Sequence, residues 1–266
     1  MTQIKDKVVW ITGASSGIGE ALAHAFAKKG ATLILTARRN EELQRVSHDL
    51  ALPDDRIMIL PMDVTQYNEA QLLTEKIINR FGRIDIMVQN AGISQRSKVI
   101  ETDLAVYQKL MDVNFFSGVA ITKAVLPYMQ AQKSGHFVVT SSVAGKIGTP
   151  QRSGYNAAKH AVQGFYDALR AEVYDDNIEV TIACPGYIRT DISLNALDAQ
   201  GNKFNKMDEN QAKGISAEEC ALQIVQAVEN NKKEVIIAGM KETAGVYLKR
   251  FLPGLLYKMV RKNAPK

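Results

Sequence analysis

The chain has 266 residues, of which 46% are hydrophobic, and a formal net charge of +5, so it can bury a large core in one or two domains. Two cysteines (Cys184 and Cys220) exclude a disulfide framework, and no apolar run is long enough to predict a membrane span. The early charges of Lys5, Asp6 and Lys7 do not favour a signal peptide, so we expect a cytoplasmic protein. Residues 241–266 hold seven of the 33 basic side chains and one of the 28 acidic ones, so the rest is nearly neutral and predicts no nucleic-acid-binding face.

Seven short apolar runs alternate along the chain with longer segments of helical periodicity. The runs are rich in Val and Ile, as strands buried on both faces are, and they cover residues 8–12, 32–36, 56–60, 84–89, 137–141, 179–184 and 234–238. The helical segments cover residues 17–29, 40–51, 67–81, 102–132, 154–174 and 216–231. This alternation predicts an α/β fold with a parallel sheet between helices. Since no repeat or linker interrupts it, we expect a single domain.

A glycine-rich turn, TGASSGIG, joins the first strand to the first helix. Its glycines allow a tight turn, close backbone approach and close helix–strand packing. Several backbone N–H groups and a helix N-terminus then face one point, which suits a pyrophosphate. Glycine turns also occur in ordinary loops, but the strand–turn–helix order favours a dinucleotide site. The residues predicted to form it are Gly13, Ser15, Ser16, Gly17, Ile18 and Gly19.

The end of the second strand indicates which dinucleotide binds. In NAD sites an acidic residue about 20 positions after the glycine turn accepts a hydrogen bond from the ribose 2′-hydroxyl. Here Ala37 stands at that position, and Arg38 and Arg39 follow. A guanidinium can hold a 2′-phosphate through two parallel N–H bonds. The pattern favours NADP(H) over NAD, with Arg38 as the main contact, unless both arginines only face solvent.

The glycine spacing T-G-x-x-x-G-x-G resembles that of the short-chain dehydrogenase/reductase family, and five further motifs of that family follow in order over residues 7–240. These motifs are Asp63 and Val64 in PMDVT; Asn90, Ala91 and Gly92; Asn114 in MDVNFFSG; Ser142 with the Y-x-x-x-K pair Tyr155 and Lys159; and Pro185 and Gly186, followed by Ile188 and Thr190. The resemblance implies a single-domain, Rossmann-type doubly wound parallel sheet of seven strands over residues 1–240.

The resemblance also implies hydride transfer between a nicotinamide and a carbonyl or alcohol carbon, with Asn114, Ser142, Tyr155 and Lys159 as a catalytic tetrad. Tyr155 would be the acid/base and Ser142 would hold the substrate oxygen. Lys159 would bind the ribose, and Asn114 would anchor a relay water. Tyr155 and Lys159 lie four residues apart, on one face of a helix, and a free phenol has a pKa of about 10. We therefore expect the ammonium group to lower the phenol pKa.

The remaining motif residues are implied to bind the dinucleotide: Asp63, Val64, Asn90, Ala91, Gly92, Tyr155, Lys159, Pro185, Gly186, Ile188 and Thr190. Taken singly, several motif residues have structural interpretations: Asp63 as a turn former, Asn114 as a helix amide, and Ser142 as a strand-end serine, with the neighbouring Ser141 as the alternative to it in the motif. None of the four histidines has metal-like spacing, so no metal site is predicted. A non-catalytic dinucleotide sensor or scaffold predicts a lost tetrad member, and none is lost.

Two segments bear on the substrate and its access. Residues 190–215 are polar and weakly periodic, so we interpret them as a mobile lid over a pocket that residues 94–99, 144–152 and Tyr187 also line. Residues 184–202 look most like the branch of the family with the seven-B type of dehydrogenase/reductase and the hydroxysteroid dehydrogenases. That likeness implies a lipophilic carbonyl or alcohol substrate.

Residues 241–266 form a basic amphipathic extension, interrupted at Pro253 and Gly254. One hypothesis is weak peripheral contact with an anionic membrane. The break at Pro253 favours the alternative, in which the tail covers the substrate entrance or contacts a partner subunit. The family resemblance implies a homodimer or homotetramer, formed through helices near 102–126 and 154–174.

Overall fold

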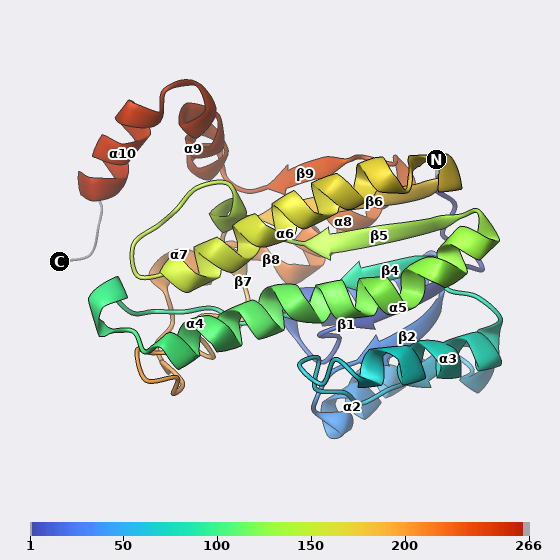
Figure 1. Ribbon diagram of the computed structural model, residues 1–266. Coiled ribbons are helices and arrows are strands. Elements are labelled where there is room, and N and C mark those ends of the chain that lie inside the picture. The colour runs from blue at the N-terminus through green and yellow to red at the C-terminus, as the bar shows by residue number, and fades with distance from the viewer. Residues whose placement is uncertain (1, 263–266) are drawn as a thin grey trace.

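The computed structural model describes residues 2–262, which fold into a sheet with helices on both faces (Figure 1). Within these residues the main sheet has seven strands in the order β3-β2-β1-β4-β5-β6-β9, and every neighbouring pair is parallel. The strands are β1 (Val8–Thr12), β2 (Thr32–Thr36), β3 (Ile57–Ile59), β4 (Ile86–Gln89), β5 (Gly135–Thr140), β6 (Ile178–Pro185) and β9 (Glu234–Ile237). The predicted doubly wound sheet is confirmed, and its order reverses between β1 and β4, where a ligand crevice is expected.

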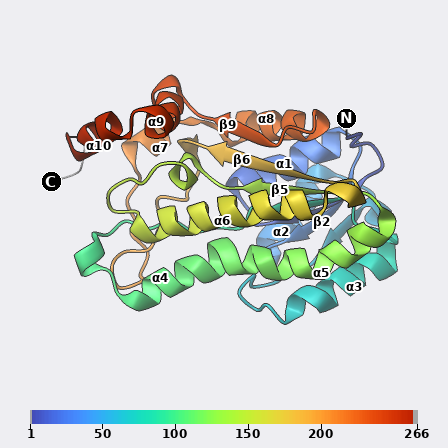
Figure 2. The same ribbon diagram turned by 45° about the horizontal axis from the view of Figure 1, so that its top comes forward.

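The two helical layers explain why the strands lack polar alternation. In β1, Val9 and Ile11 face one layer, whereas Val8 and Trp10 face the other, and all four are buried. Both faces of the strand are therefore apolar. Helices α1 (Gly17–Lys28), α2 (Asn40–Leu50) and α8 (Ala217–Glu229) cover the first face; α3 (Glu69–Phe81), α5 (Ser117–Gln132) and α6 (Ser153–Glu172) cover the second (Figures 1 and 2).

The helix predicted over residues 102–132 is wrong in one respect, because it is interrupted. It consists of α4 (Leu104–Met111), a π-helical turn (Asp112–Phe116) and α5. Within the turn, the Asn114 amide donates a hydrogen bond to the carbonyl oxygen of Leu110 at 2.9 Å. Such single-turn π-helices often lie at functional sites. Here the turn carries Asn114, which is buried, to the carboxyl end of β4.

The 190–215 segment docks onto the loop that follows β4. Leu197 pairs with Gln95, and the Arg96 N–H donates to the Leu197 carbonyl at 2.8 Å. Ala196 is fully buried, so an apolar anchor fixes a mostly polar segment. The short elements β7 (Ile188–Arg189), α7 (Glu209–Ala212) and β8 (Ile215–Ser216) flank it. The segment predicted as a lid thus lies against the loop that follows β4.

The C-terminal extension forms two helices, α9 (Met240–Phe251) and α10 (Pro253–Lys262), beside the same end of the sheet (Figure 2). The helices separate at Leu252, since Pro253 has no N–H with which to continue α9. Leu256 of α10 is buried against Val143 and Ile147, just after Ser142. Among the described residues, no helix is long and apolar enough to cross a membrane.

Candidate active site

Three of the four predicted tetrad residues meet where β5 ends and α6 begins. Lys159 Nζ lies 5.7 Å from the centre of the Tyr155 ring and donates to the Thr140 carbonyl at 2.8 Å. Ser142 lies beside the Tyr155 phenol, where its side chain acts to lower the pKa of that phenol. Tyr155 is 8% exposed and Lys159 is 4% exposed. A phenol, a hydroxyl and an amine thus converge in a site largely shielded from water.

Of the two serines that end β5, only one faces the phenol. Ser141 Oγ donates to the Lys159 carbonyl at 3.2 Å and accepts from Gln163 Nε2 at 3.0 Å. Ser141 therefore ties α6 to the sheet. Ser142 Oγ donates to the Pro185 carbonyl at 3.2 Å and accepts from the Ala144 N–H at 3.1 Å. This network holds the Ser142 hydroxyl beside Tyr155.

The expected lowering of the Tyr155 pKa by Lys159 is wrong for the protein alone. Burial raises the pKa of Tyr155 above its ordinary value of 10.0. The Ser142 side chain and the positive charges of Arg152 and Arg96 oppose this rise without reversing it. Tyr155 shares an apolar cluster with Leu197 of the docked segment, which contributes to the burial. The phenol is therefore protonated at neutral pH.

Burial also makes the charged form of Lys159 less stable. It lowers the pKa of Lys159 from 10.5 to about 8, against a smaller opposing effect of Cys184. An amine with this pKa can exchange a proton near neutral pH far more readily than an ordinary lysine can. Lys159 is therefore suited to passing protons as well as to supplying charge.

Asn114 and Lys159 lie on the same side of Gly92, since a β-carbon there would lie 2.8 Å from Asn114 Oδ1 and 3.6 Å from Lys159 Nζ. The Asn114 amide donates to the Ile93 carbonyl at 3.1 Å and to Leu110, and its oxygen accepts from the Ile93 N–H at 3.1 Å. Both amide N–H groups are thus used, so only the second lone pair of Oδ1 is left for a water. A cavity of about 10 Å³, lined by Asn114 and Lys159 among others, has room for roughly one water molecule.

The glycine turn has the shape that a pyrophosphate needs. A β-carbon on Gly19 would lie 2.1 Å from the Gly13 carbonyl oxygen, and one on Gly13 would lie 2.9 Å from Ala91 Cα. Gly17 has a φ of +58°, which favours glycine, and begins α1. The preceding Ser16 makes no side-chain cap, so the first N–H groups of α1 remain available to an anion. The residues fit a dinucleotide phosphate.

The other predicted cofactor contacts border this turn, and several also hold the fold together. Asn90 Nδ2 donates to the Thr12 carbonyl at 3.2 Å, which joins the ends of β1 and β4. A β-carbon on Gly17 would lie 3.1 Å from Thr190 Cγ2, so the segment after β6 reaches the turn. Asp63 Oδ1 accepts from the Thr65 N–H at 3.0 Å, as in an ordinary turn. The Asp63 carboxylate therefore stabilises a turn, in addition to its predicted role in cofactor binding.

The two arginines after β2 are both exposed, but they differ in their contacts. Arg39 Nη2 donates to Ser15 Oγ of the glycine turn at 3.3 Å. Ala37 is 8% exposed and leaves no carboxylate at the end of the strand. The guanidinium groups therefore dominate the charge on this side of the turn.

Sequence reasoning missed an ion cluster beside Tyr155. Arg96 and Arg152 each donate from Nη2 to Asp208 Oδ2 at 3.2 Å. The three residues come from the loop after β4, the start of α6 and the docked segment. Arg96 and Arg152 fell within the ranges predicted to line the pocket, but no motif marked them. Separations of 56 and 112 residues leave no local sequence signal for such a cluster.

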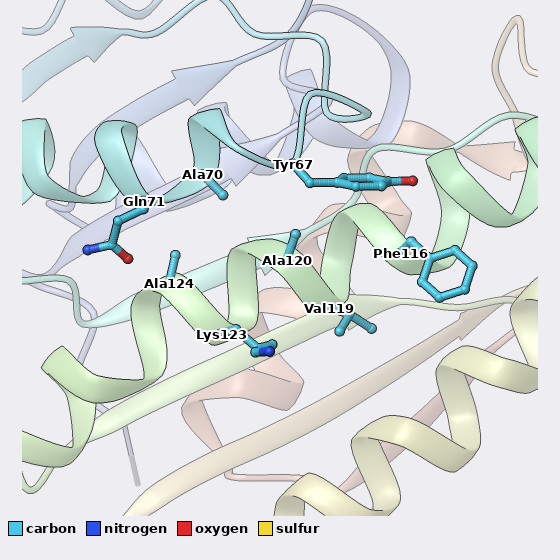
Figure 3. Close-up of a pocket in the computed structure, with 8 residues that line it drawn as sticks. All are labelled: Tyr67, Ala70, Gln71, Phe116, Val119, Ala120, Lys123 and Ala124. Atoms are coloured by element: carbon cyan, nitrogen blue, oxygen red, sulfur yellow. The ribbon is translucent and has the colours of Figure 1, made fainter.

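A larger groove of about 490 Å³ lies between α3 and α5, away from the tetrad (Figure 3). Small side chains such as Ala70, Ala120 and Ala124 form its floor, and Tyr67 and Phe116 stand at one end. Lys123 is the basic group among the residues that line it. The groove has none of the predicted catalytic or cofactor residues, so we assign the chemistry to the carboxyl ends of the strands.

Comparison with known proteins gives extensive matches. The family model described as short chain dehydrogenase matches residues 7–201. A Drosophila melanogaster protein named dehydrogenase/reductase SDR family protein 7-like is 43% identical over 268 residues, 99% of this chain and 82% of its own. Mouse (Mus musculus) dehydrogenase/reductase SDR family member 7B is 38% identical over 267 residues, 99% of this chain and 83% of its own. The predicted likeness to the seven-B type is confirmed.

Solved structures share the fold. A short-chain dehydrogenase from Streptomyces avermitilis superposes with a TM-score of 0.80 at 28% identity, covering 97% of this chain and 96% of its own. A short chain dehydrogenase/reductase from Burkholderia phymatum, solved in complex with NAD, gives a TM-score of 0.85 at 23% identity, covering 96% of each chain. The second likeness is evidence of fold alone.

Proposed function

The chain belongs to the short-chain dehydrogenase/reductase family, and on that basis we propose that it is an NADP(H)-dependent oxidoreductase acting on a carbonyl or secondary alcohol of a lipophilic substrate. The observation that carries the proposal is the meeting of Ser142, Tyr155 and Lys159 beside the glycine turn. Nicotinamide cofactors supply the hydride in such reactions, so the protein has to place the substrate and manage one proton.

In this proposal Ser142 holds the substrate carbonyl oxygen by a hydrogen bond, and Tyr155 donates its proton to that oxygen as negative charge develops. The raised pKa of Tyr155 favours this direction, because the phenol is protonated at neutral pH. Lys159 then restores the phenol proton, with a pKa of about 8 that suits exchange. A water in the cavity beside Asn114 would connect Lys159 to solvent. Asn114 is a positioning residue in this scheme.

We propose that Arg38 makes NADPH the preferred coenzyme, although a fold relative was solved with NAD. Arg38→Ala is expected to lower kcat/KM for NADPH by about 10- to 100-fold, the effect of losing a hydrogen bond to a charged group. The loss with NADH should be smaller, because NADH has no 2′-phosphate. Steady-state kinetics with both coenzymes measure this, with Arg45→Ala on α2 as a control. Equal losses with NADPH and NADH would rule out the assignment.

The proposal also covers the oligomeric state of the protein and its location in the cell. Leu104 at the start of α4 is 72% exposed and Phe116 before α5 is 46% exposed, which supports a homodimer or homotetramer through this face. Sedimentation equilibrium would return the monomer mass if this is wrong. The buried, unpaired Cys184 and Cys220 support a cytoplasmic location.

The C-terminal helices support both interpretations of the tail. Leu256 anchors α10 over the segment after Ser142, whereas Tyr247 and Phe251 of α9 are 57% and 74% exposed among basic residues. We propose that the tail covers the substrate entrance and adds at most weak membrane contact. Co-sedimentation with anionic liposomes at low salt would reveal such contact, and an unchanged supernatant fraction would exclude it.

A further inference from the structure

The cluster of Arg96, Arg152 and Asp208 has two positively charged groups and only one negatively charged group. Two guanidinium groups share one carboxylate oxygen, Asp208 Oδ2. The other oxygen, Oδ1, is used elsewhere, since it accepts from the N–H groups of Asn210 and Gln211 at the start of α7. The cluster therefore has a net charge of +1 in a largely buried place.

Burial makes this arrangement costly for the fold. The side chains of Arg96, Arg152 and Asp208 are 8%, 16% and 20% exposed. Burial lowers the pKa of Arg96, and the neighbouring charge of Arg152 lowers it further. One arginine would be enough to hold Asp208 and dock the 190–215 segment. The second adds repulsion and desolvation cost, which an anionic ligand would offset.

Arg152 is also placed to bind such a ligand. Within residues 2–262 its guanidinium donates one hydrogen bond, to Asp208, out of the five N–H groups that an arginine carries. The guanidinium lies over the Tyr187 ring, with Cζ 5.6 Å from the ring centre, so a cation–π contact helps to hold it in place. A fixed guanidinium matches the oxygen spacing of a phosphate or carboxylate.

The position of Arg96 and Arg152 indicates that the bound anion would be part of the substrate. Arg152 immediately precedes α6 and lies three residues before Tyr155, and the positive charges of both arginines act on the Tyr155 phenol. The N-terminal end of the 20-residue helix α6 adds a partial positive charge at the same place. An anion bound here would belong to the molecule whose carbonyl reaches Tyr155.

We propose that the carbonyl substrate carries an anionic group, a phosphate monoester or a carboxylate, which Arg96 and Arg152 bind in place of Asp208. The inference rests on the proposed function and names the substrate class of that site. Asp208 then serves as an internal counterion on the 190–215 segment. Because the substrate anion releases Asp208 from the arginines, its binding is coupled to movement of that segment.

The test uses nine octyl ketones whose second arm has two, three or four methylene groups and ends in a hydroxyl, a phosphate monoester or a carboxylate. NADPH oxidation gives kcat/KM for each. We expect at least one anionic ketone to exceed the hydroxyl ketone of equal arm length by tenfold or more. Whether phosphate or carboxylate gives the larger ratio identifies the anion.

Variants show whether the arginines cause the preference. Arg152→Gln and Arg96→Gln should each reduce the anionic-to-neutral ratio by about 10- to 100-fold, and Arg152→Lys should retain part of it. Arg45→Gln removes an equal charge from the surface of α2 and should retain all of it. NADPH affinity, measured alongside, verifies that each variant is folded.

Two results would overturn the inference, and they differ in what they imply. The first is an anionic-to-neutral ratio of kcat/KM within threefold for the wild type, or a ratio that Arg152→Gln leaves unchanged, while the hydroxyl ketones are still reduced. This result would exclude the anion site and leave the proposed function standing. Oxidation of NADPH with none of the nine ketones would count against both.

Discussion

Tyr155→Phe is expected to lower kcat for ketone reduction by about 10³-fold, within the range that a positioned general acid contributes. The substitution removes one oxygen from a buried side chain and keeps the ring in its apolar cluster. The Ser142 hydroxyl remains to hold the carbonyl, so KM should change much less than kcat. Steady-state NADPH oxidation with a reducible ketone measures the effect.

A matched control separates chemistry from stability. Tyr174→Phe makes the same change at a tyrosine that is 80% exposed and follows the end of α6 opposite to Tyr155, and it should leave kcat within twofold. NADPH should bind both variants as it binds the wild type. If Tyr155→Phe retains more than a tenth of the wild-type kcat, the phenol is not the proton donor.

Gly19→Ala is expected to weaken NADPH binding by at least about 100-fold. The added β-carbon would lie 2.1 Å from the Gly13 carbonyl oxygen and 2.6 Å from Asn90 Nδ2, so the turn has to move. That movement redirects the N–H groups that would face the pyrophosphate. It should also reduce the free energy of unfolding by about 1–3 kcal/mol, as overpacking does. Fluorescence titration and urea denaturation measure the two effects.

Gly164→Ala is the control, because the β-carbon it would add meets nothing within 4 Å beyond its chain neighbours and the adjacent backbone of its own helix, α6. It should bind NADPH normally and unfold at a slightly higher urea concentration, since Ala favours a helix. Wild-type NADPH affinity in Gly19→Ala would show that the turn does not bind the phosphates.

The parts of the fold that the sequence predicted are those with strong local signals. Strands such as β1 and β2 are apolar on both faces, and their predicted bounds match the structure. The glycine turn was predictable because its spacing has a steric cause, visible at Gly13 and Gly19. These signals need no knowledge of distant contacts.

The features that sequence reasoning missed depend on tertiary contacts. The π-helical turn at Asn114 interrupts a segment whose apolar periodicity suggests one continuous helix. The raised pKa of Tyr155 comes from burial in an apolar cluster that includes Leu197, and the Tyr–Lys spacing does not reveal this burial. The pairing of Arg96 with Asp208 joins residues 112 positions apart. In each case the deciding partner is remote in sequence.

The most direct test of the proposed reaction follows the transferred hydrogen itself. NADPH deuterated at the transferable position of the nicotinamide is incubated with the protein and a ketone that it reduces, and the product alcohol is analysed by mass spectrometry and NMR. The account predicts one deuterium on the carbinol carbon with the wild-type protein and almost none with Tyr155→Phe in the same time. An alcohol without deuterium, or equal labelling by both proteins, would contradict it.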